Sequence, residues 1–299
     1  WDSWDQSKSE WLEDQDKAAA LVLVETTLKA LPDILRGIIP ATDVMFPNSS
    51  MHLVEGVYKH NQIADYFNET LADTVVDYLR ARVSDDSSFQ MRILEIGAGT
   101  GGTSAMLFSR LKPYQDHVSE YCYTDISKAF LLHAQREYGA ENPYLSYKLF
   151  DVSQAVSGQG IDLGSYDIVL ATNVLHATSN IRQALRNSKA LLKSNGLLLL
   201  NEISGNILFT HLTFGLLDGW WLYEDVELRI SGCPGLSPES WQNVLTVEGF
   251  TGVVFPAQGA HDLGQQVIVA ESNGIIRQNM KIAVFEPQQN ISPVFELKS

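Results

Sequence analysis

Gly97, Gly99 and Gly101 lie between a short apolar run and an amphipathic segment. A glycine-rich turn between a strand and a helix brings backbone N–H groups close to a ligand at the helix N-terminus. Glycine also adopts positive φ readily and has no Cβ to hold a ligand away. The sequence therefore predicts that these three glycines bind a cofactor.

Glu95 helps to choose between cofactors. Gly97, Gly99 and Gly102 also fit the dinucleotide pattern G-x-G-x-x-G. A carboxylate at the end of a strand can accept a bond from a cationic amino-acid group, whereas a pyrophosphate would gain nothing from that charge. A tight turn without a ligand is the alternative, and three glycines in five residues argue against it. We expect Glu95 to contact the cofactor.

His176 and Glu202 each follow an apolar run that is typical of a strand, and the two strands are expected to be neighbours. An imidazole with an ordinary pKa of about 6.5 can act as a base near neutral pH. A carboxylate behind the ring would fix its tautomer and strengthen it as a base. A packing histidine is the alternative, and the acid on the neighbouring strand favours the base.

Other residues at strand ends are candidates for cofactor binding. Asp125 is placed to accept both hydroxyls of a ribose, or to cap the helix that begins near Ser127. Asp151, followed by Val152, is placed for an adenine amino group, with a plain loop acid as the alternative. Asn173 follows the fourth predicted strand, where its carbonyl or side chain could meet the cofactor's amino group.

Residues 207–229 form an apolar and aromatic segment outside the regular alternation of strands and helices. It follows the strand that carries Glu202, so we expect Phe214, Trp220 and Trp221 to line a substrate pocket. The alternative is an amphipathic helix packed on the core. In either case a hydrophobic patch of this size should be buried against something.

The sequence predicts an alternation of strands and helices that would position these residues. The predicted strands are 93–96, 119–124, 144–150, 166–171, 197–203, 252–255 and 265–271; the predicted helices are 103–111, 127–138, 180–192 and 238–248, with a turn at Asn195-Gly196. Continuously apolar strands separated by helices are typical of a parallel sheet covered on both faces. The last two strands predict an antiparallel edge. Ligands bind beyond the carboxyl ends of the strands in such a sheet.

The first part of the chain has a different pattern. Segments 18–31 and 63–79 are predicted helices, Pro32 interrupts the first, and 38–58 is loop or broken structure. This part is either a lid over the cofactor cleft or a helical layer on the sheet. We divide the chain into a helical lid subdomain at 1–88, a core at 89–272 and an extension or linker at 273–299, with a possible strand at 281–285.

Composition restricts partners and compartment. The net charge of −15, from 36 acidic and 21 basic residues, argues against a nucleic acid or an anionic membrane as principal partner. No run approaches the roughly 20 apolar residues of a membrane span, and no signal peptide is evident. Cys122 and Cys233 lack metal-site spacing and cannot form a disulfide framework, which predicts a cytoplasmic protein without a metal. Because the chain starts at Trp1 rather than methionine, we expect a domain of a longer polypeptide.

Several motifs, in this order, resemble the methyltransferase domains embedded in modular polyketide synthases. They are ILEIGAGTGGT, YTDIS, FDVS, YDIVLATNVLHAT, LLLLNEI, TFGLLDGWWL and LSPESWQNVLTVEGF. The first contains E-x-G-x-G-x-G, which is similar to the first motif of class I S-adenosylmethionine-dependent methyltransferases. The resemblance covers residues 20–272. It implies a Rossmann-like α/β fold, with S-adenosyl-L-methionine as methyl donor and S-adenosyl-L-homocysteine as product.

The same resemblance implies methylation of the α-carbon of a β-ketoacyl chain. That chain would be tethered through phosphopantetheine to an acyl carrier protein, beside other domains of the same synthase. The family's His–Glu dyad corresponds to His176 and Glu202, and a lid tyrosine is also implicated, for which we choose Tyr66. Related domains methylate a β-hydroxyl oxygen, so the dyad leaves carbon or oxygen open. A NAD(P)-dependent dehydrogenase would need motifs that the sequence lacks, and the intact glycines and dyad argue against an inactive spacer domain.

Overall fold

The computed structural model describes residues 2–277 of the chain, and these residues form a seven-stranded sheet. The strands are β1 (Met91–Ile96), β2 (Val118–Asp125), β3 (Leu145–Leu149), β4 (Tyr166–Thr172), β5 (Leu192–Ile203), β6 (Phe250–Val254) and β7 (Gln265–Ser272). Their order is β3-β2-β1-β4-β5-β7-β6. The first five strands pair in parallel, and β7 pairs antiparallel with both β5 and β6. This confirms the predicted sheet and its antiparallel edge.

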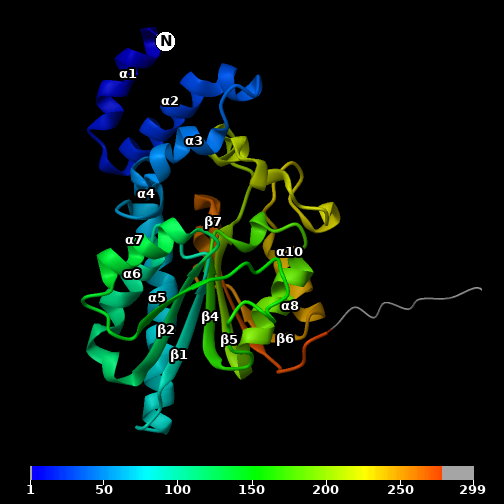
Figure 1. Ribbon diagram of the computed structural model, residues 1–299. Coiled ribbons are helices and arrows are strands. Elements are labelled where there is room, and N and C mark those ends of the chain that lie inside the picture. Colours follow the sequence, from blue (N-terminus) through cyan, green and yellow to red (C-terminus); the bar gives the residue numbers. More distant parts are fainter. Residues whose placement is uncertain (1, 278–299) are drawn as a thin grey trace, which may run out of the picture.

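Helices cover both faces of the sheet and one end of it (Figure 1). They are α1 (Asp2–Leu12), α2 (Gln15–Leu35), α3 (Ala41–Met45), α4 (His52–Tyr58), α5 (Gln62–Asp85), α6 (Gly102–Leu111), α7 (Lys128–Tyr138), α8 (Ile181–Leu191), α9 (Leu208–Leu212) and α10 (Pro238–Val247). Short 3-10 turns are η1 (Pro47–Ser49), η2 (Lys112–His117), η3 (Leu175–Ala177), η4 (Phe214–Leu216), η5 (Asp218–Trp221), η6 (Val226–Leu228) and η7 (Gln258–Leu263). Apolar residues of α5, α6 and α7 pack on one face, and those of α8 and α10 pack on the other.

The apolar strands explain this two-sided packing. Successive side chains of a strand point to opposite faces, so a strand covered on both faces needs apolar residues at every position. In β1, Ile93 belongs to the cluster under α5 and α6, whereas Leu94 and Ile96 belong to the cluster under α8 and α10. The carboxyl ends of the parallel strands consequently meet at one edge, where polar side chains face a common space.

Two local predictions are wrong. Pro32 does not interrupt the first long helix, because it lies in the last turn of α2, where a missing N–H removes only one helical bond. Asn195 and Gly196 do not form a turn before a strand but lie within β5. The β4–β5 register shifts across them, and Asn195 has φ of 63°. A bulge therefore accommodates the turn-forming residues without ending the strand.

The helical N-terminal region is confirmed, and its parts lie in different places. The long helix α5 runs along the sheet face, whereas α2, α3 and α4 lie over the carboxyl edge beside residues 208–228, shown in yellow (Figure 1). An apolar cluster of Leu23, Met45 and Val54 joins these two regions through Phe209 and Phe214.

A hydrogen bond also crosses between the two regions. Thr27 Oγ1 donates to the Leu212 carbonyl at 2.8 Å. We call the combined arrangement of α2, α3, α4 and residues 208–228 the cap. Of the predicted extension at 273–299, only residues 273–277 are described, and the possible strand at 281–285 lies outside the described residues. None of the described helices is long and apolar enough to cross a membrane.

Candidate active site

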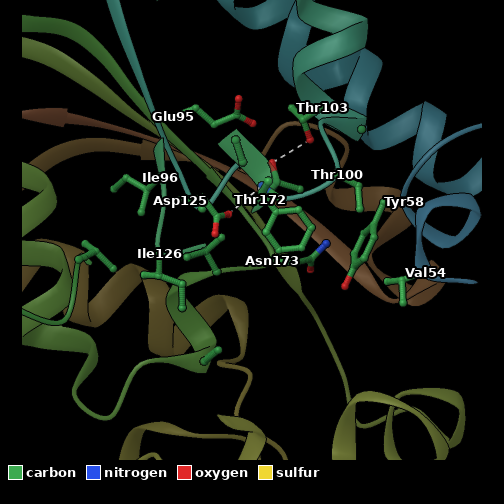
Figure 2. A pocket seen from close by; sticks show the side chains of 18 of the residues that line it. Val54, Tyr58, Glu95, Ile96, Thr100, Thr103, Asp125, Ile126, Thr172 and Asn173 are labelled. Carbon is green, nitrogen blue, oxygen red and sulfur yellow. Dashed lines mark hydrogen bonds between the residues drawn. The ribbon is translucent and has the colours of Figure 1, made fainter. Parts of the chain in front are cut away.

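A cavity of about 430 Å³ lies between the carboxyl edge of the sheet and the cap. Figure 2 shows Glu95 and Asp125 at the sheet edge, with Asn173 beside Tyr58. Other lining residues share this position between the sheet and the helices: Val54, Asn68, Ile96, Gly97, Gly99, Thr100, Thr103, Ile126, Asp151, Val152, Thr172, Phe214 and Gln265. Four of the strand-end residues that the sequence singled out, Glu95, Asp125, Asp151 and Asn173, are therefore brought to one cavity, whereas His176 and Glu202 do not line it.

The glycines of the turn have two different surroundings: some face the cavity, and one packs against a neighbouring side chain. Gly97 and Gly99 line the cavity, whereas Gly101 does not. A Cβ on Gly99 would meet no atom closer than 3.8 Å, so this position leaves space on the cavity side. A Cβ on Gly101 would lie 2.7 Å from a ring carbon of Tyr138. The structure thus corrects the ligand-facing role predicted for Gly101, which instead is the N-cap of α6, with φ of 76°.

Glu95 is 1% exposed and lines the cavity from the end of β1. Its Oε2 accepts hydrogen bonds from the hydroxyls of Ser104, at 2.5 Å, and Tyr121, at 2.6 Å. Burial raises the pKa of Glu95 to about 7, and the two hydroxyl donors act in the opposite direction. Within the described residues no cation pairs with this carboxyl group. The site can therefore receive a cationic group from a ligand.

Asp125 and Asp151 sit at the ends of β2 and β3. Asp125 accepts backbone N–H bonds from Gly99 at 3.0 Å and Ser127 at 2.7 Å, one on each oxygen. Burial raises its pKa, and these N–H donors oppose the shift. A carboxylate oxygen can accept more than one hydrogen bond, so Asp125 can accept bonds from ligand hydroxyls while it keeps those from the Gly99 and Ser127 N–H groups. Asp151 lines the cavity beside Val152, which is 4% exposed.

Asn173 has a left-handed backbone, with φ of 55°, directly after β4. Its N–H donates to the Asn201 carbonyl at 2.7 Å, which holds the strained position. Its side-chain Oδ1 is buried at the cavity without a hydrogen-bond partner among the described residues. An orphaned acceptor in a cavity that acidic residues also line suits a ligand that brings N–H donors.

Tyr66 does not lie at the cavity, which corrects the choice of lid tyrosine. It is 44% exposed, packs edge-on against Phe67, and faces an outer groove with Asp16. Tyr58, at the end of α4, lines the cavity instead, and burial raises the pKa of its hydroxyl. Both tyrosines precede the first strand in sequence by similar distances, so only the placement of α4 and α5 determines which of them reaches the cavity.

Other lining residues were missed because their neighbours in space are distant in sequence. Asn68 accepts a bond from the Thr103 hydroxyl at 2.7 Å, and that hydroxyl lies 3.0 Å from Thr172 Oγ1 (Figure 2). Ile126, which lines the cavity, is 75% exposed. An aliphatic residue in the polar turn after Asp125 was a usable signal for a flat apolar ligand. Asn68 and Thr103 carried no comparable signal.

His176 and Glu202 form a buried pair behind the wall of the cavity. His176 Nδ1 lies 2.5 Å from Glu202 Oε2, and the two residues are 5% and 0% exposed. The other oxygen, Oε1, accepts the N–H groups of Val174 at 3.2 Å and Leu175 at 2.7 Å. Nε2 has no hydrogen-bond partner among the described residues. This arrangement presents Nδ1–H to a carboxylate and leaves the Nε2 lone pair for another group.

The three aromatic residues predicted for the substrate pocket take different positions. Phe214 lines the cavity. Trp220 is 6% exposed and packs edge-on against the His176 ring, with centroids 5.7 Å apart. Trp221 is 50% exposed and stacks on His211 at 5.9 Å, away from the cavity. The prediction therefore needs correcting for Trp221, whose indole N–H donates to Gly215 O at 2.8 Å.

The charge of the cavity restricts its ligand. Glu95, Asp125 and Asp151 line it, whereas no lysine, arginine or histidine among the described residues does. A pyrophosphate would be repelled, and a ligand with a cationic group and hydroxyls would be stabilised. The described residues also contain no group of side chains with the makeup of a metal site.

Comparison with known proteins agrees with this fold. A family model described as "Methyltransferase domain" matches residues 94–198. Polyketide synthase PksM of Bacillus subtilis (strain 168) is 60% identical over 292 residues, which cover 98% of this chain and 7% of PksM. The chain thus spans less than a tenth of that relative.

Two solved structures cover most of the chain. The DszA carbon methyltransferase superposes with a TM-score of 0.84 at 39% identity, covering 91% of this chain and 70% of the chain in that structure. The trans-methyltransferase CalH, solved in complex with SAH, superposes with a TM-score of 0.71 at 28% identity, covering 91% of this chain and 72% of CalH.

Proposed function

This chain belongs to the methyltransferase domains of polyketide synthases, and we propose that it methylates the α-carbon of a β-ketoacyl chain. The chain would be a thioester on the phosphopantetheine arm of an acyl carrier protein, supplied within the same synthase. The observation that carries this proposal is the buried pair of His176 and Glu202, with Nε2 free to take a proton.

The methyl donor is S-adenosylmethionine, which leaves as S-adenosylhomocysteine. When bound, it supplies an electrophilic methyl group on a sulfonium. The cavity fits this molecule because Gly99 leaves open space and Asn173 Oδ1 lacks a partner. We assign Asp125 to the ribose hydroxyls and Glu95 to the ammonium group.

The adenine ring would lie at the other end of the cavity. Ile126 offers an apolar surface for its face, and Asp151 with Val152 can meet its polar edge. Neutral donors must hold the cofactor's carboxylate, because the described lining contains no cation. Tyr58, at the end of α4, and Gln265, at the start of β7, line the cavity and carry such donors.

The dyad can generate the nucleophile. A carbon between a ketone and a thioester is acidic enough for an imidazole to remove its proton, which would go to His176 Nε2. The imidazolium that forms is stabilised by Glu202 at 2.5 Å and lies where an enolate oxygen can accept a hydrogen bond from it. The protein's other contribution is to align the enolate carbon with the methyl group.

Access to Nε2 requires a change in residues 208–228. His176 is 5% exposed, and Trp220 covers the ring edge. The acyl chain would enter by displacing the side of this segment that carries Trp220, while Phe214 contacts both the cavity and the apolar cluster of the cap. We therefore assign substrate contact to Phe214 and Trp220.

The test compares carrier proteins loaded with β-keto and β-hydroxy chains. With S-adenosylmethionine, we expect methylation of the β-keto chain, and mass spectrometric fragmentation should place the methyl on the α-carbon. Solvent deuterium should also enter that carbon when a cofactor analogue without a transferable methyl is bound. Methylation of a β-hydroxyl oxygen without α-proton exchange would establish the O-methylating reaction instead.

His176→Ala tests the base. It should lower α-proton exchange and methyl transfer by about 100-fold or more, whereas cofactor affinity measured by calorimetry should stay near that of the parent. Tyr66→Phe is a matched control, because Tyr66 lies outside the cavity. Exchange by His176→Ala at the parent's rate would show that another group is the base.

A further inference from the structure

Arg229 is a buried cation that the proposed chemistry does not use. Its side chain is 1% exposed and pairs with Asp225, with Nε to Oδ1 at 2.6 Å. Three of the other four N–H donors reach carbonyl oxygens: Nη1 donates to His176 O at 2.8 Å and Pro234 O at 2.7 Å, and Nη2 donates to Thr178 O at 3.0 Å. Every nitrogen of the guanidinium is therefore engaged.

One of these carbonyls, that of His176, belongs to the turn that carries the proposed base, and a second, that of Thr178, belongs to the residue that ends the turn. The turn η3 (Leu175–Ala177) is held on its N–H side by Glu202 Oε1, which accepts from Val174 and Leu175. Arg229 holds the C=O side of the same turn at His176 and Thr178. The N–H groups of the turn thus donate to the Glu202 carboxylate, and its carbonyl groups accept from the Arg229 guanidinium. Both interactions oppose rotation of the turn.

Asp225 extends this attachment to the following helix. Its Oδ2 accepts the Ile181 N–H at 2.6 Å, at the first residue of α8. The backbone of Glu224 also donates to Ser179 O at 2.8 Å. The end of the segment that carries Trp220 is consequently fixed to His176 and to the residues that follow it, up to Ile181.

We propose that Arg229 is a positioning residue that sets the orientation of the His176 ring against Glu202 and Trp220. This inference rests on the proposed role of His176 as the base. Arginine suits the task because its planar guanidinium directs donors to Asp225 and to the turn at once. A lysine presents one nitrogen and would leave buried carbonyls without donors.

Arg229→Lys tests the proposal in the folded protein. A ring displaced by a fraction of an ångström should lower kcat for methyl transfer by about 10- to 100-fold, whereas the cofactor dissociation constant should change less than about twofold. Asp225→Asn keeps the shape and removes the charge that orients the guanidinium, so it should lower kcat in the same direction by a smaller factor.

The control is Arg186→Lys. Arg186, in α8, is also a poorly exposed arginine, with Nε 2.7 Å from Glu248 Oε2 at the end of α10, and it does not line the cavity. A loss caused by general destabilisation should be similar in both lysine variants. Thermal unfolding and cofactor titration measure the folded fraction, by which each kcat is corrected.

Proton NMR supplies a readout independent of turnover. The proton between His176 Nδ1 and Glu202 Oε2 should give a resonance far downfield of the amides, identified by its loss in His176→Gln. Arg229→Lys should shift or broaden it, and Arg186→Lys should leave it in place.

Separate results would overturn this inference and the proposed function. If both Arg229→Lys and Asp225→Asn keep the parent's kcat and resonance, or lose activity only in step with folded protein, Arg229 has no positioning role, although His176 could still be the base. If the parent catalyses no α-proton exchange, the proposed function fails, and a shift of the resonance in Arg229→Lys would then show only that the turn is held by Arg229 without serving that reaction.

Discussion

The ends of β1 and β5 each carry a buried glutamate, and the two carboxyl groups are held in different ways. Glu95 is 1% exposed and meets two neutral hydroxyls, both on one oxygen. Glu202 is 0% exposed, and its two oxygens are divided between backbone N–H groups and His176. Glu95 has capacity for an incoming cation, whereas Glu202 is committed to its own turn.

This difference shows how one residue type at one sheet edge can perform two tasks. A carboxyl group whose partners are neutral and incomplete is unfavourable in its charged form until a ligand arrives. A carboxylate surrounded by N–H donors is stabilised in its charged form and orients those donors. The first arrangement favours binding, and the second favours positioning.

The largest effect should come from Glu202. We expect Glu202→Gln to lower kcat by about 100-fold, because an amide cannot accept from both the turn and the imidazole as a carboxylate does. Cofactor affinity, measured by calorimetry, should stay within about twofold of the parent. A variant that loses cofactor binding to the same extent as kcat would break the distinction between the two strand ends.

A smaller and opposite pattern is expected at the end of β1. Glu95→Gln should weaken S-adenosylmethionine binding by about 10- to 100-fold, because a charge-assisted bond is worth about 1.5–3 kcal/mol. At saturating cofactor, kcat should recover to near the parent's value. If kcat stays low at saturating cofactor, Glu95 contributes to the chemical step, and the division into a binding glutamate and a positioning glutamate is wrong.

The smallest effect should be the dependence of binding on pH. With the pKa of Glu95 raised to about 7, cofactor affinity should rise as pH increases from 6 to 7, by at most tenfold per unit, and then level off. Glu95→Gln should remove this part of the profile. An unchanged profile in the variant would assign the titration to another group.

The raised pKa of Glu95 also predicts how the stability of the cofactor-free protein changes with pH. The folded protein holds the Glu95 proton up to a pKa of about 7, whereas the unfolded chain loses it near the ordinary value of 4.5. Stability from this group is therefore complete below about pH 4.5 and decreases as pH rises towards 7. Thermal melting of the parent and Glu95→Gln across this range should show the difference.

The sheet and the strand-end residues could be predicted because their signals are local. An apolar run ended by an acid, as at Glu95 or Asp125, defines both a strand and the position of the side chain beyond it. The antiparallel edge followed from two strands joined without a helix. His176 and Glu202 were linked because neighbouring parallel strands end together.

The cap could not be predicted in the same way, because its contacts join distant parts of the chain. Nothing local distinguishes Tyr58 from Tyr66, and only the docking of α4 on the sheet edge brings Tyr58 to the cavity. Trp220 and Trp221 are adjacent in sequence, yet one covers His176 and the other stacks on His211. Packing of side chains, rather than composition, decides which of each pair contacts the site.

The bond from Thr27 to the Leu212 carbonyl has a consequence for how such domains diversify. If residues 208–228 contact the acyl chain as proposed, exchanging them between relatives is a route to a different acyl preference. Their inner surface, however, rests on helices encoded far upstream, so a graft that ignores α2, α3 and α4 would meet a mismatched partner. We therefore expect the sequences of α2–α4 and of residues 208–228 to change together when substrate preference changes in this family, although the two segments are far apart in the gene.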